Sequence, residues 1–542
     1  MLGRGDLGAG AGLDAVLILL KLAVLEGLMD PVIIVAGAII TLLTATPVFL
    51  QMRKHPRGMH ILFFAEMWER FSYYGMRSLL VFYLTQHFLF TRENANLQYG
   101  AYTSLVYLLP LIGGFLADKY LGTRKAVAFG ALLLVAGHTA MAIEGTAYRE
   151  VLNVGDRAYV FTTEGRGAAA QTWLDVEGSR CAVNPGDDFT GECSLRVEQR
   201  ETGASTADGV AETATVILFN GMPASAGLPT EMDAATWEAS RSIEGRQPLF
   251  ESVFYIALSL IIMGVGFLKS NISTMVGQLY PKGDPRRDPG FTLYYFGINL
   301  GSFWATILCG GLSQAYGWWA GFGLAGALMA VGFLVFVRGR LLFFTPGPNQ
   351  LPDNVGRPLE PEKLRKPVLG PLSLEHSIYL GGLLCVGLVW LMVQRNAVIG
   401  TILSISSIVI LAYLGYLMTT KFSKVERDRL ILALVLIAMS VVFWTLFEQA
   451  GSSLSLFAED HTQLGVSGYF QITAEQTQSF NAGFILLFAP VFAWLWSYLG
   501  RKNMDFNPGL KFGLALVQVG GAFFILLLGA LLAKHWVEKN GD

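Results

Sequence analysis

Charged side chains are scarce in this sequence. Aspartate, glutamate, lysine and arginine make up 15% of the 542 residues, apolar residues make up 53%, and the mean hydropathy is +0.47. Soluble domains do not have this composition. The chain also lacks a glycine-rich phosphate loop ending in lysine, a Ser/His/Asp group and clustered Cys/His spacing. We therefore expect neither an enzyme nor an ATP-driven pump, and we expect no cofactor, no metal site and no nucleic-acid partner.

Long apolar stretches are what the sequence has instead. A membrane-spanning helix needs about 20 apolar residues. Stretches of this kind lie at Pro31–Leu50, Ile61–Leu89, Tyr99–Leu116, Ala126–Ile143, Phe250–Leu268, Phe291–Cys309, Trp318–Val337, Ile378–Val393, Thr401–Met418, Leu430–Phe457, Phe480–Leu499 and Leu510–Leu532. Stretches this long predict an all-α membrane protein, a helical bundle and not a barrel.

One of these stretches carries ionisable residues together with paired tyrosines: Glu66, Glu69, Arg70, Tyr73, Tyr74 and Arg77. Their spacing places them on one side of a helix. Because an ionised side chain near the bilayer centre costs at least about 2.5–3.5 kcal/mol, this side should face a wet or paired interior. We expect a proton or substrate relay. The alternative is a chance run of side chains that reach for water at a helix end.

Basic residues gather in alternate loops, which predicts that these loops face the cytoplasm. They are Arg53, Lys54, Arg57, Lys119, Arg124, Lys125, Lys282, Arg286, Arg287, Lys421, Lys424, Arg427, Arg429, Arg501 and Lys502. The segment from Tyr148 to Gln247 has no lysine and is expected outside the membrane. Alternating residues at Arg157–Thr162, Gln171–Val176, Ser194–Glu198 and Thr213–Phe219 predict that it is strand-rich.

Cys181 and Cys193 form a close pair in this exported segment. A disulfide between them is expected in an oxidising compartment, although two unpaired thiols would give the same spacing. His87 and His138 lie toward the outer ends of their spans and are interpreted as surface histidines. The apolar stretch Leu13–Met29 lacks the features of a cleaved signal peptide, so we expect it at the membrane interface or in a hairpin with the next span.

Five separated motifs resemble those of the proton-coupled oligopeptide transporters, a branch of the major facilitator superfamily. They are Glu66–Gly75, Gly113–Gly122, Gly264–Ser273, Tyr294–Gly301 and Phe443–Gln449. The resemblance covers about Gly58–Ala533 apart from the exported insertion. It implies proton-coupled symport of di- and tripeptides by alternating access, in the bilayer of a bacterial inner membrane. The insertion would then be periplasmic or extracellular, with an unknown partner.

The resemblance also implies roles for individual residues. Proton coupling would involve Glu66, Glu69, Arg70 and Glu448, and a gating salt bridge would join Arg77 to Glu448. Substrate would contact Tyr73, Tyr74, Arg77, Tyr107, Lys269, Asn299, Trp444 and Asn481. Three of these, Tyr107, Asn299 and Trp444, could equally be helix-packing residues. Lys269 could instead extend to the cytoplasmic edge of the membrane.

The expected organisation has six parts: an N-terminal extension with one extra span (1–57), helices one to three (58–146), the exported insertion (147–248), helices four to six (249–340), a linker with two extra helices (341–425), and a partial second bundle (426–542). The family continues with three further helices, including one that carries an amine-binding glutamate. We therefore expect a shortened second half or a truncated reading frame. Two other functions stay open: carriage of another small solute such as nitrate, and a non-transporting membrane anchor whose exported domain binds a partner.

Overall fold

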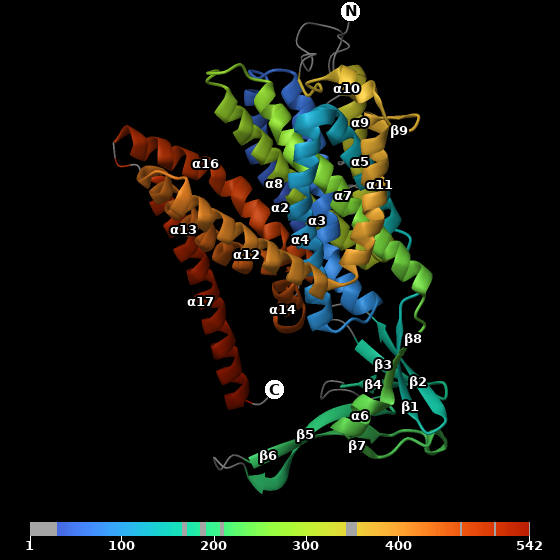
Figure 1. The fold of residues 1–542 in the computed structure, drawn as a ribbon. Coiled ribbons are helices and arrows are strands. Elements are labelled where there is room, and N and C mark those ends of the chain that lie inside the picture. Colours follow the sequence, from blue (N-terminus) through green and yellow to red (C-terminus); the bar gives the residue numbers. More distant parts are fainter. Residues whose placement is uncertain are drawn as a thin grey trace, which may run out of the picture.

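The computed structural model describes residues 30–164, 171–184, 191–205, 211–342, 355–466, 469–502, 504 and 506–540. Long helices form a bundle, and a β-sheet projects from one end of it (Figure 1). We call this the sheet end. The basic loops that follow α2 and η2 lie at the opposite end. The predicted segment Leu13–Met29 lies outside the described residues.

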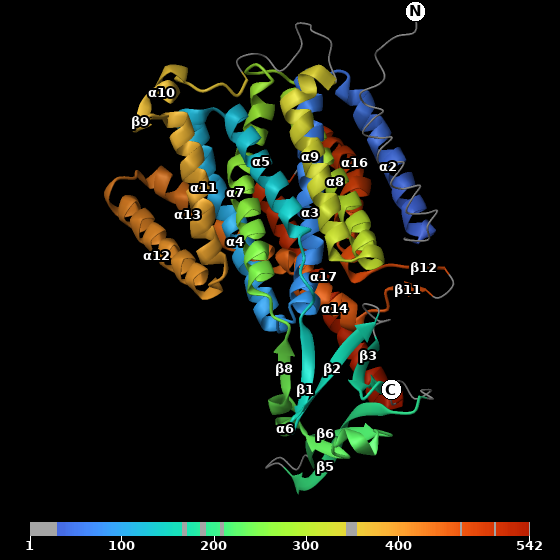
Figure 2. The same cartoon turned by 90° about the vertical axis from the view of Figure 1, so that its right-hand side faces the viewer.

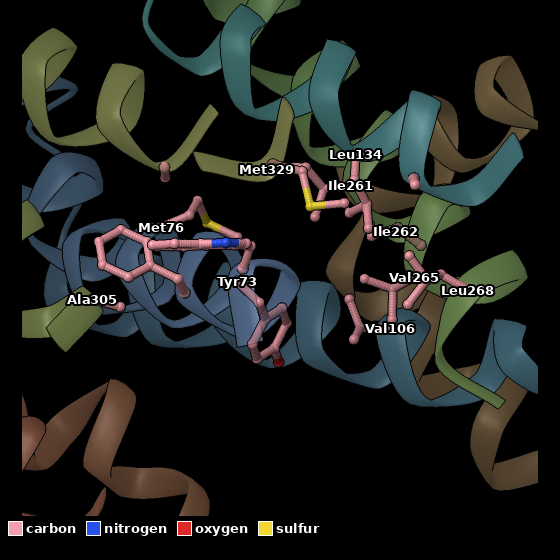
Figure 3. Close-up of a cluster of buried hydrophobic side chains, with 14 of the residues drawn as sticks. Tyr73, Met76, Val106, Leu134, Ile261, Ile262, Val265, Leu268, Ala305 and Met329 are labelled. Carbon is pink, nitrogen blue, oxygen red and sulfur yellow. The ribbon is translucent and has the colours of Figure 1, made fainter. Parts of the chain in front are cut away.

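The first half of the bundle contains most of the buried side chains. Its helices are α3 (Gly58–Phe82), α4 (Arg92–Leu116), α5 (Thr123–Met141), α7 (Pro248–Gln278), α8 (Arg287–Tyr316) and α9 (Trp318–Leu342), with single π-turns η1 (Tyr83–His87) and η2 (Ala117–Leu121). Figure 3 shows part of the shared core, where Tyr73 and Met76 of α3 lie among apolar side chains such as Val106, Ile261 and Met329.

Glycines allow two of these helix crossings to be close. A Cβ added at Gly130 of α5 would lie 2.6 Å from the carbonyl oxygen of Gly264 in α7, and one at Gly113 of α4 would lie 2.1 Å from that of Gly266. Small residues at such positions let helix backbones approach where lipid supplies no hydrophobic driving force. The crossings fix α7, and with it Lys269, against the helices that carry the rest of the candidate site.

An additional helix, α2 (Pro31–Met52), lies beside α8 (Figure 2). Thr41 accepts a hydrogen bond from the indole nitrogen of Trp304 at 2.9 Å. Asp30 caps the helix and also accepts a hydrogen bond from the backbone nitrogen of Gln471 at 2.7 Å. This helix therefore contacts both α8, through Trp304, and the β11–β12 region, through Gln471.

The later helices expose long apolar surfaces, and the last of them, drawn in orange and red, lie to one side of the first half (Figure 1). They are α10 (Pro361–Arg365), α11 (Leu374–Val393), α12 (Asn396–Thr420), α13 (Lys424–Phe447), α14 (Ser453–His461), α15 (Ala474–Thr477), α16 (Ser479–Arg501) and α17 (Pro508–Asn540). Short hairpins join β9 (Pro367–Leu369) to β10 (Leu372–Ser373), and β11 (Gly465–Val466) to β12 (Phe470–Gln471). We call α13 to α17 the second half.

The exported segment folds as an eight-stranded sheet with the order β7-β6-β5-β4-β3-β2-β1-β8. The strands are β1 (Arg149–Val154), β2 (Arg157–Glu164), β3 (Gln171–Val176), β4 (Ser179–Val183), β5 (Ser194–Ser205), β6 (Ala211–Asn220), β7 (Glu231–Asp233) and β8 (Arg241–Glu244). Neighbours are antiparallel except β4 and β5. Short helices η4 (Ala224–Ala226) and α6 (Ala234–Ser240) precede β7 and β8. The sulfur atoms of Cys181 and Cys193 are bonded.

The predicted membrane helical bundle is confirmed, and ten described helices are long and apolar enough to cross a bilayer. Two details of the prediction are wrong. The α-helix expected over Leu430–Phe457 ends at Phe447, where a 3-10 turn, η5 (Glu448–Gly451), and the non-helical residue Ser452 interrupt it. His87, in η1, and His138, in α5, are 4% and 0% exposed because neighbouring elements of the bundle cover them.

Candidate functional site

The polar side of α3 is buried in the first half. Glu66, Glu69 and Arg70 are 1%, 0% and 6% exposed. The Nε atom of Arg70 lies 2.8 Å from a carboxylate oxygen of Glu66 and 3.0 Å from one of Glu69. These side chains meet because they are three and four residues apart on one helix. One guanidinium thus serves two carboxylates, and none of the three side chains reaches out at a helix end. We call this group the triad.

Lys269 of α7 lies near the triad. Its ammonium nitrogen is 3.8 Å from the centre of the Tyr107 ring on α4, and it interacts electrostatically with Arg70, Glu69, Glu66 and Glu448. An ammonium over an aromatic face is stabilised by the ring quadrupole. Lys269 therefore extends toward the interior of the bundle and not toward the cytoplasmic edge.

Arg77 connects the two halves. One of its terminal nitrogens lies 3.0 Å from a carboxylate oxygen of Glu448 in η5, and its Nε donates a hydrogen bond to the hydroxyl of Tyr99 at 2.6 Å. Tyr107 donates a hydrogen bond to the other Glu448 oxygen at 3.3 Å. The side chains of Arg77 and Glu448 are 6% and 22% exposed, so water screens this pair only weakly. We call Arg77, Tyr99, Tyr107 and Glu448 the gate cluster.

The paired tyrosines of α3 lie between these two groups. The ring centre of Tyr73 is 5.8 Å from the Cζ atom of Arg70, and that of Tyr74 is 5.6 Å from the Cζ atom of Arg77. The two rings pack edge to face, with centres 5.2 Å apart. A continuous row of charged and aromatic side chains therefore runs from the triad to the gate cluster.

Three predicted substrate residues contact this row weakly or not at all. Asn299 is buried, and its amide nitrogen donates a hydrogen bond to the carbonyl of Tyr295 in its own helix at 2.9 Å. Trp444 is 44% exposed, with its ring 6.2 Å from that of Tyr107. Asn481 lies on α16 and lines a different cavity of about 570 Å³ between α14, the β11–β12 hairpin, α16 and α17. That cavity is mostly apolar and contains no triad residue.

Two tyrosines of the site were not selected from the sequence. Tyr99 accepts the hydrogen bond from Arg77, and Tyr294 of α8 is buried and interacts with the Glu66 carboxylate. Tyr294 opens a motif that the sequence had already singled out, so that motif was the available signal. Tyr99 lies two turns before Tyr107 in the same apolar stretch, but nothing in its spacing separates it from a packing residue.

A second set of polar contacts joins the two halves at the sheet end. Gln86 donates a hydrogen bond to Glu459 of α14 at 2.6 Å, and Arg92 forms an ion pair with Asp460. Gln314 of α8 donates a hydrogen bond to Glu475 of α15 at 3.3 Å. Burial, together with the nearby charges of Glu475 and Asp460, raises the pKa of Glu459 to about 7, against the opposing effects of Gln86 and Arg92. We call these contacts the rim.

This arrangement can hold and move protons and bind a zwitterion. The triad has two acidic groups for one guanidinium, so an added proton neutralises a surplus negative charge. Lys269 offers a cation, and the tyrosines offer hydroxyls that can donate or accept hydrogen bonds. The gate cluster and the rim join the two halves at the sheet end, while α16 packs against α8 elsewhere.

The chain is similar in sequence to known membrane transporters. The sequence profile described as "PTR2: POT family" matches residues 224–541. The chain is 28% identical to "Peptide transporter YePEPT" of Yersinia enterocolitica subsp. palearctica over 90% of this chain and 76% of that protein. It is also 28% identical to "Di-/tripeptide transporter" of Lactococcus lactis subsp. lactis, over 88% and 76%.

A solved structure is similar as well. The crystal structure of a peptide transporter described as POT, in complex with sulfate, matches with a TM-score of 0.57 and 28% identity. The match covers 87% of this chain and 74% of that one. The similarity therefore extends over most of the chain in both sequence and fold.

Proposed function

Because the chain belongs to the POT family of membrane transporters, we propose that it couples the inward movement of protons to uptake of di- and tripeptides. The observation that carries this proposal is the buried triad joined by a row of charged and aromatic side chains to an ion pair between the two halves. Relatives described as peptide transporters support the choice of cargo.

The coupling would depend on the charge of the triad. With both carboxylates ionised, Glu66, Glu69 and Arg70 together carry one negative charge in a buried site, where an unpaired charge is costly. A proton on either carboxylate would remove that surplus. Lys269 could also compensate this charge. A substrate carboxylate that pairs with Lys269 would weaken that compensation and so make protonation of the triad more favourable. Proton and substrate would then favour the same conformations, which is what coupled transport requires.

Peptide binding would use the groups around the triad. A dipeptide carries an amine, a carboxylate and side chains of variable chemistry, so its site needs a cation, hydrogen-bonding groups and tolerant walls. We assign the carboxylate to Lys269, because Arg77 is already engaged by Glu448 and Tyr99. The backbone would be held by Tyr73, Tyr74 and Tyr107. Asn299, Trp444 and Asn481 remain proposed contacts that would require rearrangement.

The gate cluster would act during alternating access. With Arg77 and Glu448 paired, the sheet end is held together. Separation of the pair would admit substrate from that side. We further propose that the sheet end faces the periplasm or the cell exterior of a bacterial inner membrane, since the basic loops lie at the other end. The divisions at 57, 146, 248, 340 and 425 would then separate the extension, the two parts of the first half, the insertion, the linker with its helix pair, and the second half.

Uptake into liposomes tests the proposal. Purified protein is reconstituted, and labelled dialanine uptake is measured with and without an inward proton gradient. We expect Glu66→Gln to abolish gradient-driven uptake while it retains exchange of labelled for unlabelled dipeptide. Glu375→Gln is the matched control: this glutamate pairs with Lys125 at 2.6 Å outside the candidate site, so uptake should stay close to that of the unsubstituted protein.

Competition distinguishes the alternatives. Excess unlabelled dipeptide should abolish labelled uptake, and excess nitrate should not affect it. Inhibition by nitrate alone would favour a carrier of small anions. Folded protein with no dipeptide exchange at all would refute the proposal and favour a membrane anchor.

A further inference from the structure

A glycine in the second half touches the gate cluster. Gly451 is the last residue of η5 and lies three positions after Glu448. It is buried, although most residues of the preceding helix α13 are exposed. Its neighbours come from the first half: the Tyr99 hydroxyl on α4 and the Arg77 side chain on α3. The glycine therefore lies at the contact that the two halves make.

There is no room for a side chain at this position. A Cβ atom on Gly451 would lie 2.1 Å from the Tyr99 hydroxyl oxygen, 2.8 Å from its Cζ atom and 2.8 Å from the Arg77 Nε. Carbon atoms in favourable contact are about 3.5–4.0 Å apart, so each distance is a steric overlap. The overlapped atoms are also the two that form the 2.6 Å hydrogen bond between Tyr99 and Arg77.

The backbone does not explain the glycine. Gly451 is absent from the described glycines with positive φ, which include Gly122 and Gly317, so an L-residue can adopt its conformation. Alanine is in fact favoured over glycine in helical turns. The three atoms nearest to the added Cβ all belong to the first half, so the overlap with them disappears when the two halves separate.

We propose that Gly451 is a positioning residue of the gate: its missing side chain permits the sheet end to close around Arg77, Tyr99 and Glu448. A side chain at position 451 would act as a wedge that leaves the sheet end open. The inference rests on the proposed transport function for its consequence, but its structural part depends on neither protons nor peptide.

Distance measurement between two spin labels tests it directly. Free Cys309 and Cys385 are replaced by serine, and labels are attached at the exposed positions Glu93 and Gln463, which come from α4 and from the loop after α14. The full chain is studied in lipid nanodiscs. For Gly451→Ala we expect the ratio of long to short distances to rise at least tenfold, and gradient-driven dialanine uptake to be lost. The control Gly415→Ala, where nothing lies within 4 Å of the added Cβ, should change neither quantity.

A second variant keeps the test decisive. Tyr99→Leu removes the ring and hydroxyl that overlap the added Cβ, so Gly451→Ala with Tyr99→Leu should return the distance distribution toward the short population. If Gly451→Ala alone fails to fold, this double variant should fold. Unchanged distances in a folded Gly451→Ala protein, or no recovery of either folding or short distances in the double variant, would overturn the inference. Failure of peptide transport in the unsubstituted protein would refute only the proposed function, because the label distances report closure without substrate.

Discussion

Removal of the Arg70 guanidinium should destabilise the protein more than any other single change in the triad. Arg70→Met keeps a long apolar stem but leaves Glu66 and Glu69 without the cation that contacts both, at 2.8 and 3.0 Å. All three side chains are at most 7% exposed, so water cannot replace the lost contacts. Breaking a buried ion pair by removing one partner costs about 3–5 kcal/mol.

The loss should be measurable as a fall in the thermal unfolding midpoint. At about 2 °C per kcal/mol, the lower end of the range for large domains, the midpoint should drop by roughly 6–10 °C. Intrinsic tryptophan fluorescence of the reconstituted protein during heating reports it. Arg77→Met should lower the midpoint less, because Glu448 is 22% exposed and can be reached by water.

A triple variant separates stability from function. Arg70→Met combined with Glu66→Gln and Glu69→Gln removes every charge of the triad, so neither carboxylate is left without its cation, and Lys269 keeps its interactions with Tyr107 and Glu448. We expect the midpoint to recover most of its loss, while gradient-driven uptake stays absent. If Arg70→Met unfolds within about 1 °C of the unsubstituted protein, the two carboxylates do not depend on Arg70 and the reasoning is refuted. A triple variant as unstable as Arg70→Met would show that shape and not charge determines the effect.

Three further predictions concern other parts of the chain. The pKa of Glu459 is raised to about 7 in the folded protein, so its contribution to stability is complete below its ordinary pKa near 4.5 and is lost as the pH rises through 7. Glu459→Gln should therefore make the unfolding midpoint less dependent on pH between these two values, and an unchanged pH dependence would contradict this. Cys193→Ser removes a disulfide whose cysteines are 12 residues apart, and it should lower the free energy of unfolding of the insertion by roughly 3 kcal/mol, measured by limited proteolysis in increasing urea. An equal difference between the variant and the unsubstituted protein when both are reduced would contradict this. Thr41→Val removes the 2.9 Å hydrogen bond from Trp304, at a cost of about 1 kcal/mol. Backbone amides of α2 should therefore exchange hydrogen several-fold faster, and unaltered exchange would show that this bond does not stabilise the position of the helix.

The helical bundle and the polar side of α3 could be predicted from the sequence. Apolar length alone indicated the spans, and the three- and four-residue spacing of Glu66, Glu69 and Arg70 predicted that they lie on one side of a helix that faces a wet or paired interior. Such predictions succeed because both depend on one helix at a time. The alternating residues of the insertion likewise predicted strands, and four predicted segments correspond to β2, β3, β5 and β6.

Features that depend on contacts between distant segments were harder to predict. The break after Phe447 lies in a run whose hydropathy continues to Phe457, so composition did not reveal it. His87 was interpreted as exposed because it ends a span, yet it stacks on Tyr83 with ring centres 4.5 Å apart and its carbonyl accepts a hydrogen bond from Tyr148. Tyr99 became a site residue only through α3 and η5, which approach it from other parts of the chain.

The way the sheet is attached has a mechanical consequence. The insertion leaves the bundle after α5 through β1 and returns to α7 through β8, and these strands pair side by side, with Arg149 opposite Glu244. At their base, Gln247 donates a hydrogen bond to Thr146 at 2.6 Å. Both attachment points therefore belong to two helices that pack against each other within the first half. Because both ends of the sheet are attached to the first half, a movement of the second half relative to the first would not stretch the connections of the insertion.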